Sequence, residues 1–410
     1  MSAYACVASL PGEEFDAQAT IAKDSIVLLT TEGQRRVLPF VDLTDMRLLN
    51  YHLHLSMRDD GHDGEHNDER NDGRDGESNN GQGEAPSDHK GEGADDARNR
   101  LTDMPPSTSC YEAVLSKLGY QTEEFFEKLW QAYEAKSQEA LFVAGDFIME
   151  SEGDYAYAEP GVEKSSIAKL SLYSDCLCIV PHDVGARRVP LCFAEPPVRD
   201  GFALSTRLDT GESYRIARLG GDTDPFFTKL GQARDKSVAD WQAAHRELES
   251  NLQSRLGDRI EAYRAFRAVV STGSSESSKN AMADTDARAE STADAIVTCG
   301  LFAADDDAFW FAAIADGRAA VELVTDEKAA TYLYRFSTTC AQFENSVRHA
   351  MEAVKKNRRI IYLPQDELAK EPLYRMAIDR SSPVRFLRSC NVGRIIHSAN
   401  WEERLTEFFA

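Results

Sequence analysis

The chain has 410 residues, 42% of them hydrophobic, and a formal net charge of −23. This length exceeds one ordinary domain by about two- to fourfold, so two or three hydrophobic cores are expected. The acidic balance repels the phosphate backbone, which excludes nucleic acid as an expected partner and makes binding to anionic lipid unfavourable. No apolar run approaches the ~20 residues of a membrane-spanning helix, so no integral membrane segment is expected.

The N-terminal residues and the cysteines indicate the compartment. Met1 to Leu10 hold no basic region of the kind that opens a signal peptide. Eight cysteines are scattered along the chain without a CxxC pair. That usage is typical of reduced thiols, and the sequence therefore predicts a cytoplasmic protein.

The first third of the chain reads as strands, a long polar insertion and a helix. Residues 24–28 and 35–40 have the apolar, β-branched character of strands. Residues 58–105 consist mostly of Asp, Glu, Gly, Asn, Arg and Ser, and such a stretch cannot bury enough surface to offset its ordering entropy. We interpret it as a disordered acidic insertion between two strands. An apolar helical stripe then begins near Thr122.

The same series of landmarks recurs further along the chain. Residues 175–179 and 187–193 resemble the two earlier strand segments, with Arg187 and Arg188 aligned to Arg35 and Arg36. Alternating apolar residues from 202 to 216, interrupted by a polar turn at residue 209, predict a β-hairpin. A Thr-Asp-Pro sequence at 223–225 then predicts a helix start.

One segment makes the repeat explicit. Residues 118–132 align without a gap to residues 219–233, and nine of the fifteen positions are identical. Self-similarity of this kind indicates two copies of one module, the first lengthened by the acidic insertion. Each copy has a Phe-Phe pair at its helix start, and one member of each pair is expected in its own module's core. Phe126 and Phe227 occupy the same place in the two copies, and truncation of Phe227 is expected to loosen only the second module.

A meander of strands followed by one helix resembles the pleckstrin-homology-like superfold and its GRAM-like relatives. The resemblance covers roughly residues 17–140 and 150–240 and extends to uncharacterised bacterial proteins with tandem modules. It implies an α+β fold: tandem antiparallel β-barrels or sheets, each closed by a C-terminal helix. It also implies scaffolding or ligand display and no known chemistry.

The remainder of the chain completes the predicted domain organisation. The first module spans residues 1–140, and the second spans 141–270 with a helical extension. Residues 271–294, rich in Ser, Thr, Ala and Asp, are expected to form a flexible linker. Residues 295–410 alternate strand and helix patterns and predict a C-terminal α+β domain, which could be a divergent third module.

The sequence gives no catalytic, cofactor-binding or metal site. Cys176, Cys178 and His182 are residue types that bind zinc, but a structural site needs four ligands and no second pair has the required spacing. Buried thiols are the simpler interpretation. No nucleophile elbow, phosphate-binding loop or dinucleotide-binding motif is present. No cofactor is expected.

The favoured hypothesis is therefore a non-enzymatic protein that binds a peptide or protein through its modules. An enzyme with a site in the C-terminal segment, near Cys390, is one alternative. Weak recruitment to anionic membranes through the basic run 355–359, at a predicted helix end, is another. The candidate binding residues under these hypotheses are Arg36, Arg188, Arg385, Arg388, Arg394 and His397.

Overall fold

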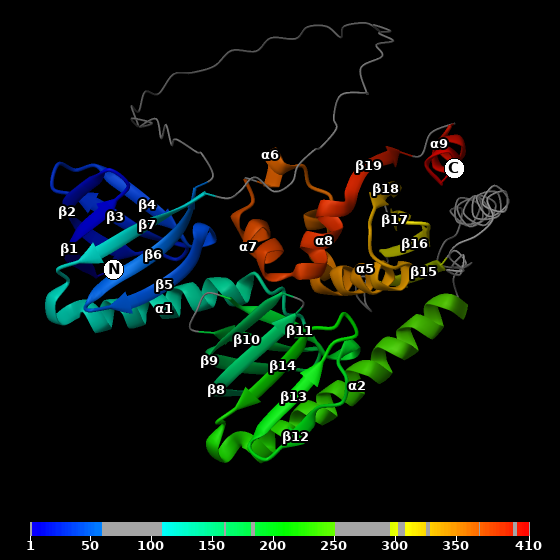
Figure 1. Ribbon diagram of the computed structural model, residues 1–410, viewed down its shortest axis with the longest axis horizontal. Coiled ribbons are helices and arrows are strands. Elements are labelled where there is room, and N and C mark those ends of the chain that lie inside the picture. The colour runs from blue at the N-terminus through cyan, green and yellow to red at the C-terminus, as the bar shows by residue number, and fades with distance from the viewer. Residues whose placement is uncertain are drawn as a thin grey trace, which may run out of the picture.

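Three antiparallel sheets follow one another along the chain (Figure 1). The computed structural model describes residues 2–59, 109–159, 161–181, 185–250, 296–301, 308–324, 329–368, 370–396 and 400–409. The predicted linker 271–294 lies outside the described residues. Of the predicted insertion 58–105, only the first two residues are described. Those two residues end a strand instead. The α+β class is confirmed, with two seven-stranded sheets and one five-stranded sheet.

The first sheet has the strand order β4-β3-β2-β1-β7-β6-β5. Its strands are β1 (Ala3–Leu10), β2 (Glu13–Ile21), β3 (Ser25–Thr30), β4 (Arg35–Pro39), β5 (Leu43–Leu49), β6 (His52–Asp59) and β7 (Ser109–Ser116). It begins earlier than the resemblance suggested, because residues 3–10 form a strand. A short 3-10 helix, η1 (Phe40–Asp42), turns the chain between β4 and β5.

The second sheet repeats this order as β11-β10-β9-β8-β14-β13-β12. Its strands are β8 (Phe147–Glu159), β9 (Val162–Tyr173), β10 (Cys176–Pro181), β11 (Arg187–Pro190), β12 (Val198–Asp200), β13 (Ala203–Arg207) and β14 (Ser213–Ala217). The 3-10 helix η3 (Leu191–Phe193) stands where η1 stands in the first sheet. Both sheets are open, since β4 does not pair with β5 and β11 does not pair with β12. Of the two forms that the resemblance implied, barrel or sheet, the structure shows the open sheet.

The most similar sequence segment folds identically in both copies. A 3-10 turn, η2 (Gly119–Gln121) or η4 (Gly220–Asp222), leads into α1 (Thr122–Glu139) or α2 (Thr223–Ser250). The first glycine of each turn has a positive φ, +63° and +57°, a conformation that glycine adopts without strain. The threonine hydroxyl of each copy donates to that glycine's carbonyl, at 2.8 and 2.9 Å. The repeated Gly and Thr thus set the angle at which each helix leaves its sheet.

Each helix buries one Phe of its pair, as expected, but the buried member is the first. Phe125 and Phe226 are fully buried, whereas Phe126 and Phe227 are only partly buried. Phe125 packs edge-on against Tyr4 of β1, with ring centroids 5.1 Å apart. Truncation of Phe226, rather than Phe227, is consequently the change that should loosen the second module.

The strand register corrects the alignment of the arginine pairs by one residue. Pro39 pairs with Ser25, and Pro190 pairs with Cys176, at the same place in the two sheets. Counting back from the prolines, Arg36 corresponds to Arg187, and the equivalent of Arg188 is a valine, residue 37. Because side chains alternate across a strand, a one-residue shift moves a side chain to the opposite face.

The third sheet has the sequential order β15-β16-β17-β18-β19, which differs from the order of the two repeats. Its strands are β15 (Ile296–Leu301), β16 (Phe309–Ala315), β17 (Arg318–Val324), β18 (Ala329–Arg335) and β19 (Asn391–Ile396). Its described helices are α5 (Cys340–Val354), η7 (Lys355–Ile361), α6 (Gln365–Leu368), α7 (Pro372–Arg380), α8 (Ser382–Cys390) and α9 (Trp401–Phe409). Residues 340–390 thus form a helical layer between β18 and β19.

The hydrophobic cores do not follow the sheets one to one. The first sheet and the helical layer of the C-terminal part share one continuous core that includes Phe125, Phe343 and Leu387. The second sheet has a core of its own around Phe226. In Figure 1 the C-terminal helix α7 lies beside the first sheet, and α5 lies above the second. The C-terminal part therefore bridges the two modules.

Candidate functional site

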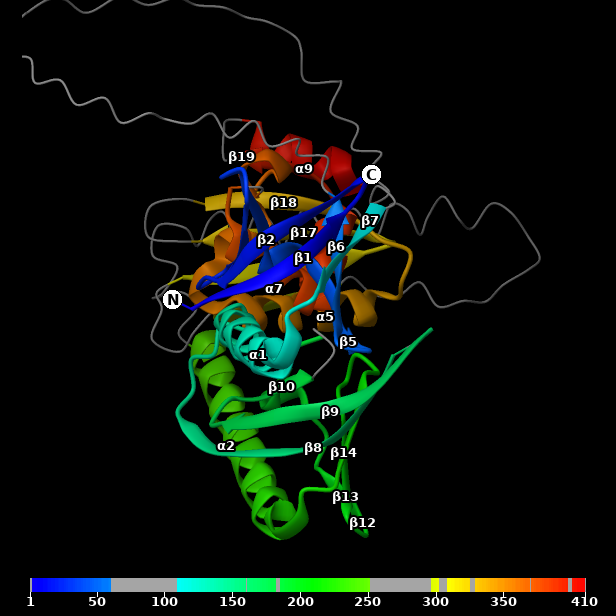
Figure 2. The same ribbon diagram turned by 90° about the vertical axis from the view of Figure 1, so that its left-hand side faces the viewer.

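The first module's helix is the element that covers the second sheet. In both ribbon views α1 lies across the second sheet at β10 (Figures 1 and 2). Cys176, Cys178 and Val180 point to this outer face of β10 and are buried in a small cluster with Leu141. Trp130 of α1 packs against the same cluster. The outer face of the second sheet is therefore a surface that binds a helix.

Two polar contacts fix α1 on this face. Lys169 of β9 forms an ion pair with Glu134 of α1 at 2.7 Å. Gln138 Nε2 donates to the hydroxyl of Tyr173 at 2.5 Å. The Lys169 side chain is 31% exposed and Glu134 only 14%, so solvent screens the pair incompletely. The contacts surround an apolar centre, which is the usual arrangement of a protein interface.

In the part of the chain that the structure describes, the equivalent face of the first sheet is exposed. Its outward residues on β2, β3 and β4, named here the free outer face, are Gln18, Val27, Leu29, Arg35 and Val37. Leu29 is 47% exposed and Val37 is 37% exposed. The register places Leu29 where Val180 is buried, and Gln18 where Lys169 meets α1. Two sheets of the same strand order thus differ in whether this face is covered.

A buried ion-pair network joins the second sheet to the C-terminal part. Arg188 of β11, only 5% exposed, donates to Asp175 at 2.9 Å and to Glu352 of α5 at 2.8 Å. Lys355 contacts Asp175 at 2.6 Å and Glu352 at 3.3 Å. Two cations and two carboxylates therefore neutralise one another inside the interface. Removing one partner would leave a buried charge uncompensated, which is strongly destabilising.

The network shifts the acidity of its members. Burial alone would raise the pKa of the Asp175 carboxyl, but Arg188 and Lys355 outweigh burial and lower that pKa from 3.8 to about 2. Burial would likewise raise the pKa of Glu352, and Arg188 holds it below its ordinary value. Burial raises the pKa of the neighbouring Cys192 thiol well above its ordinary value, so this thiol stays protonated.

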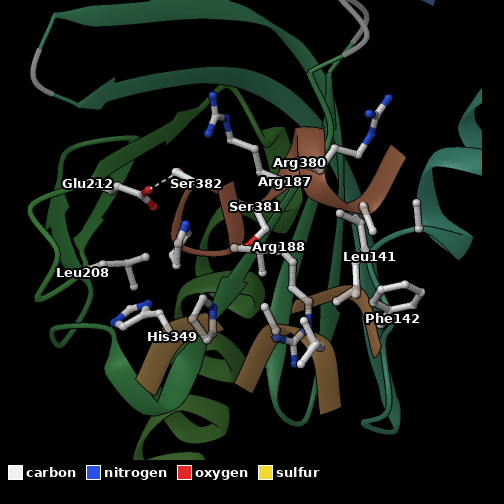
Figure 3. A pocket seen from close by; sticks show the side chains of 18 of the residues that line it. Leu141, Phe142, Arg187, Arg188, Leu208, Glu212, His349, Arg380, Ser381 and Ser382 are labelled. Atoms are coloured by element: carbon white, nitrogen blue, oxygen red, sulfur yellow. Dashed lines mark hydrogen bonds between the residues drawn. The ribbon is translucent and has the colours of Figure 1, made fainter. Parts of the chain in front are cut away.

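A second joint lies where all three parts meet, and Figure 3 shows it from close by. Ser382, at the start of α8, donates to Glu212 Oε1 at 2.8 Å, and the Tyr214 hydroxyl donates to Glu212 Oε2 at 2.8 Å. The guanidinium of Arg187 lies 3.5 Å from the ring centroid of Tyr157. The cavity at this joint measures about 40 Å³, room for roughly one water molecule, so it is a packed junction.

The structure separates the six candidate binding residues. Arg36 is exposed and lies 3.4 Å from Glu13, whereas Arg188 is buried in the network. Arg388 donates to the carbonyl oxygens of Ile360 and Leu363, at 2.8 and 2.9 Å, and so ties α8 to η7. Arg385 is exposed and donates to backbone carbonyl groups of α7. Arg394 is exposed on β19, and His397 lies outside the described residues.

The cysteines considered for chemistry lie in buried or partly buried surroundings. Burial raises the pKa of the Cys390 thiol, which lowers its nucleophilic fraction. The sulfur atoms of Cys176 and Cys178 lie 3.9 Å apart in the buried cluster, and His182 lies outside the described residues. Among the described residues, no group of three or more His, Cys, Asp or Glu side chains is placed to hold a metal ion.

The sequence interpretation missed the ion-pair network. The sequence places Lys355 at a helix end, but its side chain is only 17% exposed and forms ion pairs with Asp175 and Glu352. The basic run 355–359 therefore begins inside an interface and continues through the 3-10 helix η7. No local signal identifies Glu352 as the partner of Arg188, because 164 residues separate them along the chain.

Comparison with protein-family models gave no match, and comparison with curated proteins gave none either. None of the described helices combines the length and apolar character that crossing a membrane requires.

Proposed function

We propose that this chain is a non-enzymatic interaction protein that binds a helix of a partner protein on the free outer face of its first module. One observation carries the proposal. The same face of the second sheet is occupied by α1, while Leu29 and Val37 of the first sheet are exposed. Exposed apolar side chains grouped on adjacent strands are typical of interaction sites.

Each module is pleckstrin-homology-like in this proposal. The shared order of seven antiparallel strands, followed by one helix, supports the assignment. The buried Phe125 and Phe226 are consistent with a helix that plugs one end of a curved sheet. Scaffolding is a common use of such modules. A sheet edge binds a partner through main-chain hydrogen bonds, and side-chain pockets provide specificity, so no chemical reaction is needed.

The composition of the face indicates the kind of helix that fits. Val27, Leu29 and Val37 form an apolar centre, and Arg35 and Gln18 flank it with hydrogen-bond donors. An amphipathic helix with an apolar stripe and an acidic flank matches this pattern. The helix of the second module, α2, matches the free outer face poorly. In the repeat alignment, α2 has Gly231 at the position where α1 has Trp130.

The reduced state of the cysteines supports an intracellular setting for this partner. None of the eight cysteines forms a disulfide in the structure, and four of them are buried. Thiols in this state are typical of a reducing compartment, which favours the cytoplasm. Membrane recruitment through residues 355–359 is disfavoured, because the first lysine of the run is engaged in ion pairs.

Site-specific crosslinking in cells tests the proposal. A photo-crosslinking amino acid at position 37 should give one discrete heavier adduct, and Leu29→Asp should abolish it by placing a charge in the apolar centre. The matched control is position 198 on β12, where Val198 is 61% exposed on the second sheet. Val198→Asp should leave the adduct from position 37 unchanged. Equal, diffuse labelling at both positions, unaffected by Leu29→Asp, would refute the proposal.

A further inference from the structure

The outer face of the second sheet extends beyond the part that α1 covers. Lys169 of β9 meets α1, and Ile167, two residues earlier on the same strand, points to the same face because side chains alternate along a strand. The register continues this face from Ile167 across Asp154 of β8 to Ala217 of β14. Ile167 is 48% exposed. The outer face from Ile167 across β8, β14 and β13 is named here the uncovered half.

Two shallow hollows lie in the uncovered half, one on each side of Arg215 of β14. The first hollow is bordered by residues of β8 and β9, and the second lies toward β13 and β12. They form because Ala156 and Ala217, the neighbours of Arg215 on this face, have short side chains. Arg215 is exposed and belongs to the lining of both hollows. A ligand in either hollow therefore meets this arginine.

The Arg215 side chain makes no hydrogen bond or ion pair with any residue that the structure describes. Arg218, which lines the second hollow as well, pairs with Asp154 at 3.1 Å and engages that carboxylate. Asp200 also lines the second hollow, but β13 lies between its strand and β14, so the two main chains are about 10 Å apart. A guanidinium binds a carboxylate through charge-assisted hydrogen bonds. The donors of Arg215 are therefore available to a carboxylate from outside the described chain.

An exposed aromatic ring borders the second hollow. Phe202, in the two-residue turn between β12 and β13, is 77% exposed and lines this hollow. Tyr51 has the same place in the turn between β5 and β6 and is 68% exposed. Each ring stands two residues before a leucine, Leu53 or Leu204, that pairs with equivalent residues of β7 and β14. A ring that is so exposed adds little to its module's core, so its presence in both copies indicates contact with another molecule.

From these observations we infer that the uncovered half docks an acidic peptide segment of a partner protein. A carboxylate of the segment binds Arg215, and an adjacent apolar side chain packs against Phe202. The covered part of the same face already binds a segment in this way, since Lys169 pairs with Glu134 of α1 at 2.7 Å beside an apolar cluster. The first module has no equal site, because Val114 stands where the second has Arg215. The docking surface is thus distinct from the free outer face.

Three short peptides test this chemistry on the full chain. They are acetyl-Phe-Glu-Glu-Phe-amide, the same peptide with Gln in place of Glu, and the same peptide with Ala in place of Phe. Nitrogen-15 spectra follow the arginine Nε–H signals during each titration. The first peptide should shift the Arg215 signal downfield and bind more tightly than the other two. Arg215→Ala identifies that signal by its loss and should weaken binding of the first peptide about fivefold, the effect of one partly exposed ion pair. Phe202→Ala should weaken it by a similar factor.

Two matched controls separate the site from general charge and aromatic effects. Arg207→Ala removes an exposed arginine from the same face of β13 that lines neither hollow, and Tyr51→Ala removes the equivalent ring of the first module. Both should leave the affinity unchanged. Equal binding of the Glu and Gln peptides, equal weakening by Arg207→Ala, or no binding of any peptide would overturn the inference. A shift of the Arg215 signal on deletion of residues 60–108, with no peptide added, would overturn it too, because the chain's own acidic segment would then be the occupant.

Discussion

Arg188 and Val37 occupy the same position in two sheets of the same strand order, and they have opposite surroundings. Arg188 is 5% exposed and holds two carboxylates, whereas Val37 is 37% exposed. The two copies thus differ by one substitution at this edge strand. The arginine of the second copy binds the C-terminal part through ion pairs, whereas the valine of the first copy presents an apolar side chain. At the scale of the residue, the two copies have diverged in what they bind rather than in how they fold.

The ion-pair network predicts a specific loss of stability in acid. The folded pKa of Asp175, about 2, lies below its ordinary value of 3.8, so the unfolded chain binds protons more readily. The stabilisation by Asp175 is therefore complete above about pH 5 and disappears as the pH falls toward 2. Asp175→Asn should lower the free energy of unfolding at pH 6, and its difference from the wild type should shrink steadily below pH 5. Urea unfolding at several pH values measures this difference.

Asp235→Asn is the matched control for this experiment. Asp235 lies on α2, is 73% exposed and pairs with its neighbour Arg234 at 3.0 Å. Exposed pairs contribute little, so this variant should differ from the wild type by less than about 1 kcal/mol at every pH. A deficit of Asp175→Asn that stays constant down to pH 2.5 would show that the carboxylate charge is not what the network uses.

At the scale of the element, the position where a strand ends also depends on contacts between residues far apart in the chain. The strand β6 continues through Asp59, which pairs with Ser109 of β7, so residues 60–108 connect two adjacent strands. The sequence interpretation placed the insertion's start at residue 58. Arg58 instead forms an ion pair with Asp379 of α7 at 2.7 Å, a contact that no local pattern indicates.

Deleting residues 60–108 and joining the strands by a four-residue turn should preserve the fold. Shortening the connection from 49 to four residues lowers the entropic cost of loop closure by about 2 kcal/mol. We expect a melting temperature equal to or slightly above that of the full chain, measured by calorimetry. A second deletion that also removes Arg58 and Asp59 should be less stable, since it breaks the contact to α7. A marked fall in melting temperature for the first deletion would mean that residues 60–108 contribute to packing.

At the scale of the whole molecule, the cores predict how the chain opens. The first sheet shares its core with the C-terminal helices, and the second sheet has a core of its own. Phe125→Ala should therefore weaken hydrogen-exchange protection in the first sheet and in α5 and α8 together. Phe226→Ala should weaken protection in the second sheet alone. Each truncation of a buried Phe should cost about 3–5 kcal/mol.

The partly buried neighbours provide the controls. Phe126→Ala and Phe227→Ala should each cost less than the truncation of the adjacent buried Phe, because less apolar surface leaves water at these positions. Loss of protection across all three sheets in both Phe125→Ala and Phe226→Ala would show one cooperative core and would contradict the division into separate cores.

The sequence by itself determined the features that depend on local pattern. Strand alternation, helix periodicity and the near-identity of residues 118–132 and 219–233 predicted the α+β class and the repeat, and the structure confirms two sheets of one strand order. Tertiary structure alone decided which surfaces are covered. The open form of the sheets, the one-residue shift of the arginine pair and the burial of Lys355 depend on contacts between residues far apart in the chain. A local pattern specifies which face of an element is apolar, but the partner of that face is set by packing across the whole molecule.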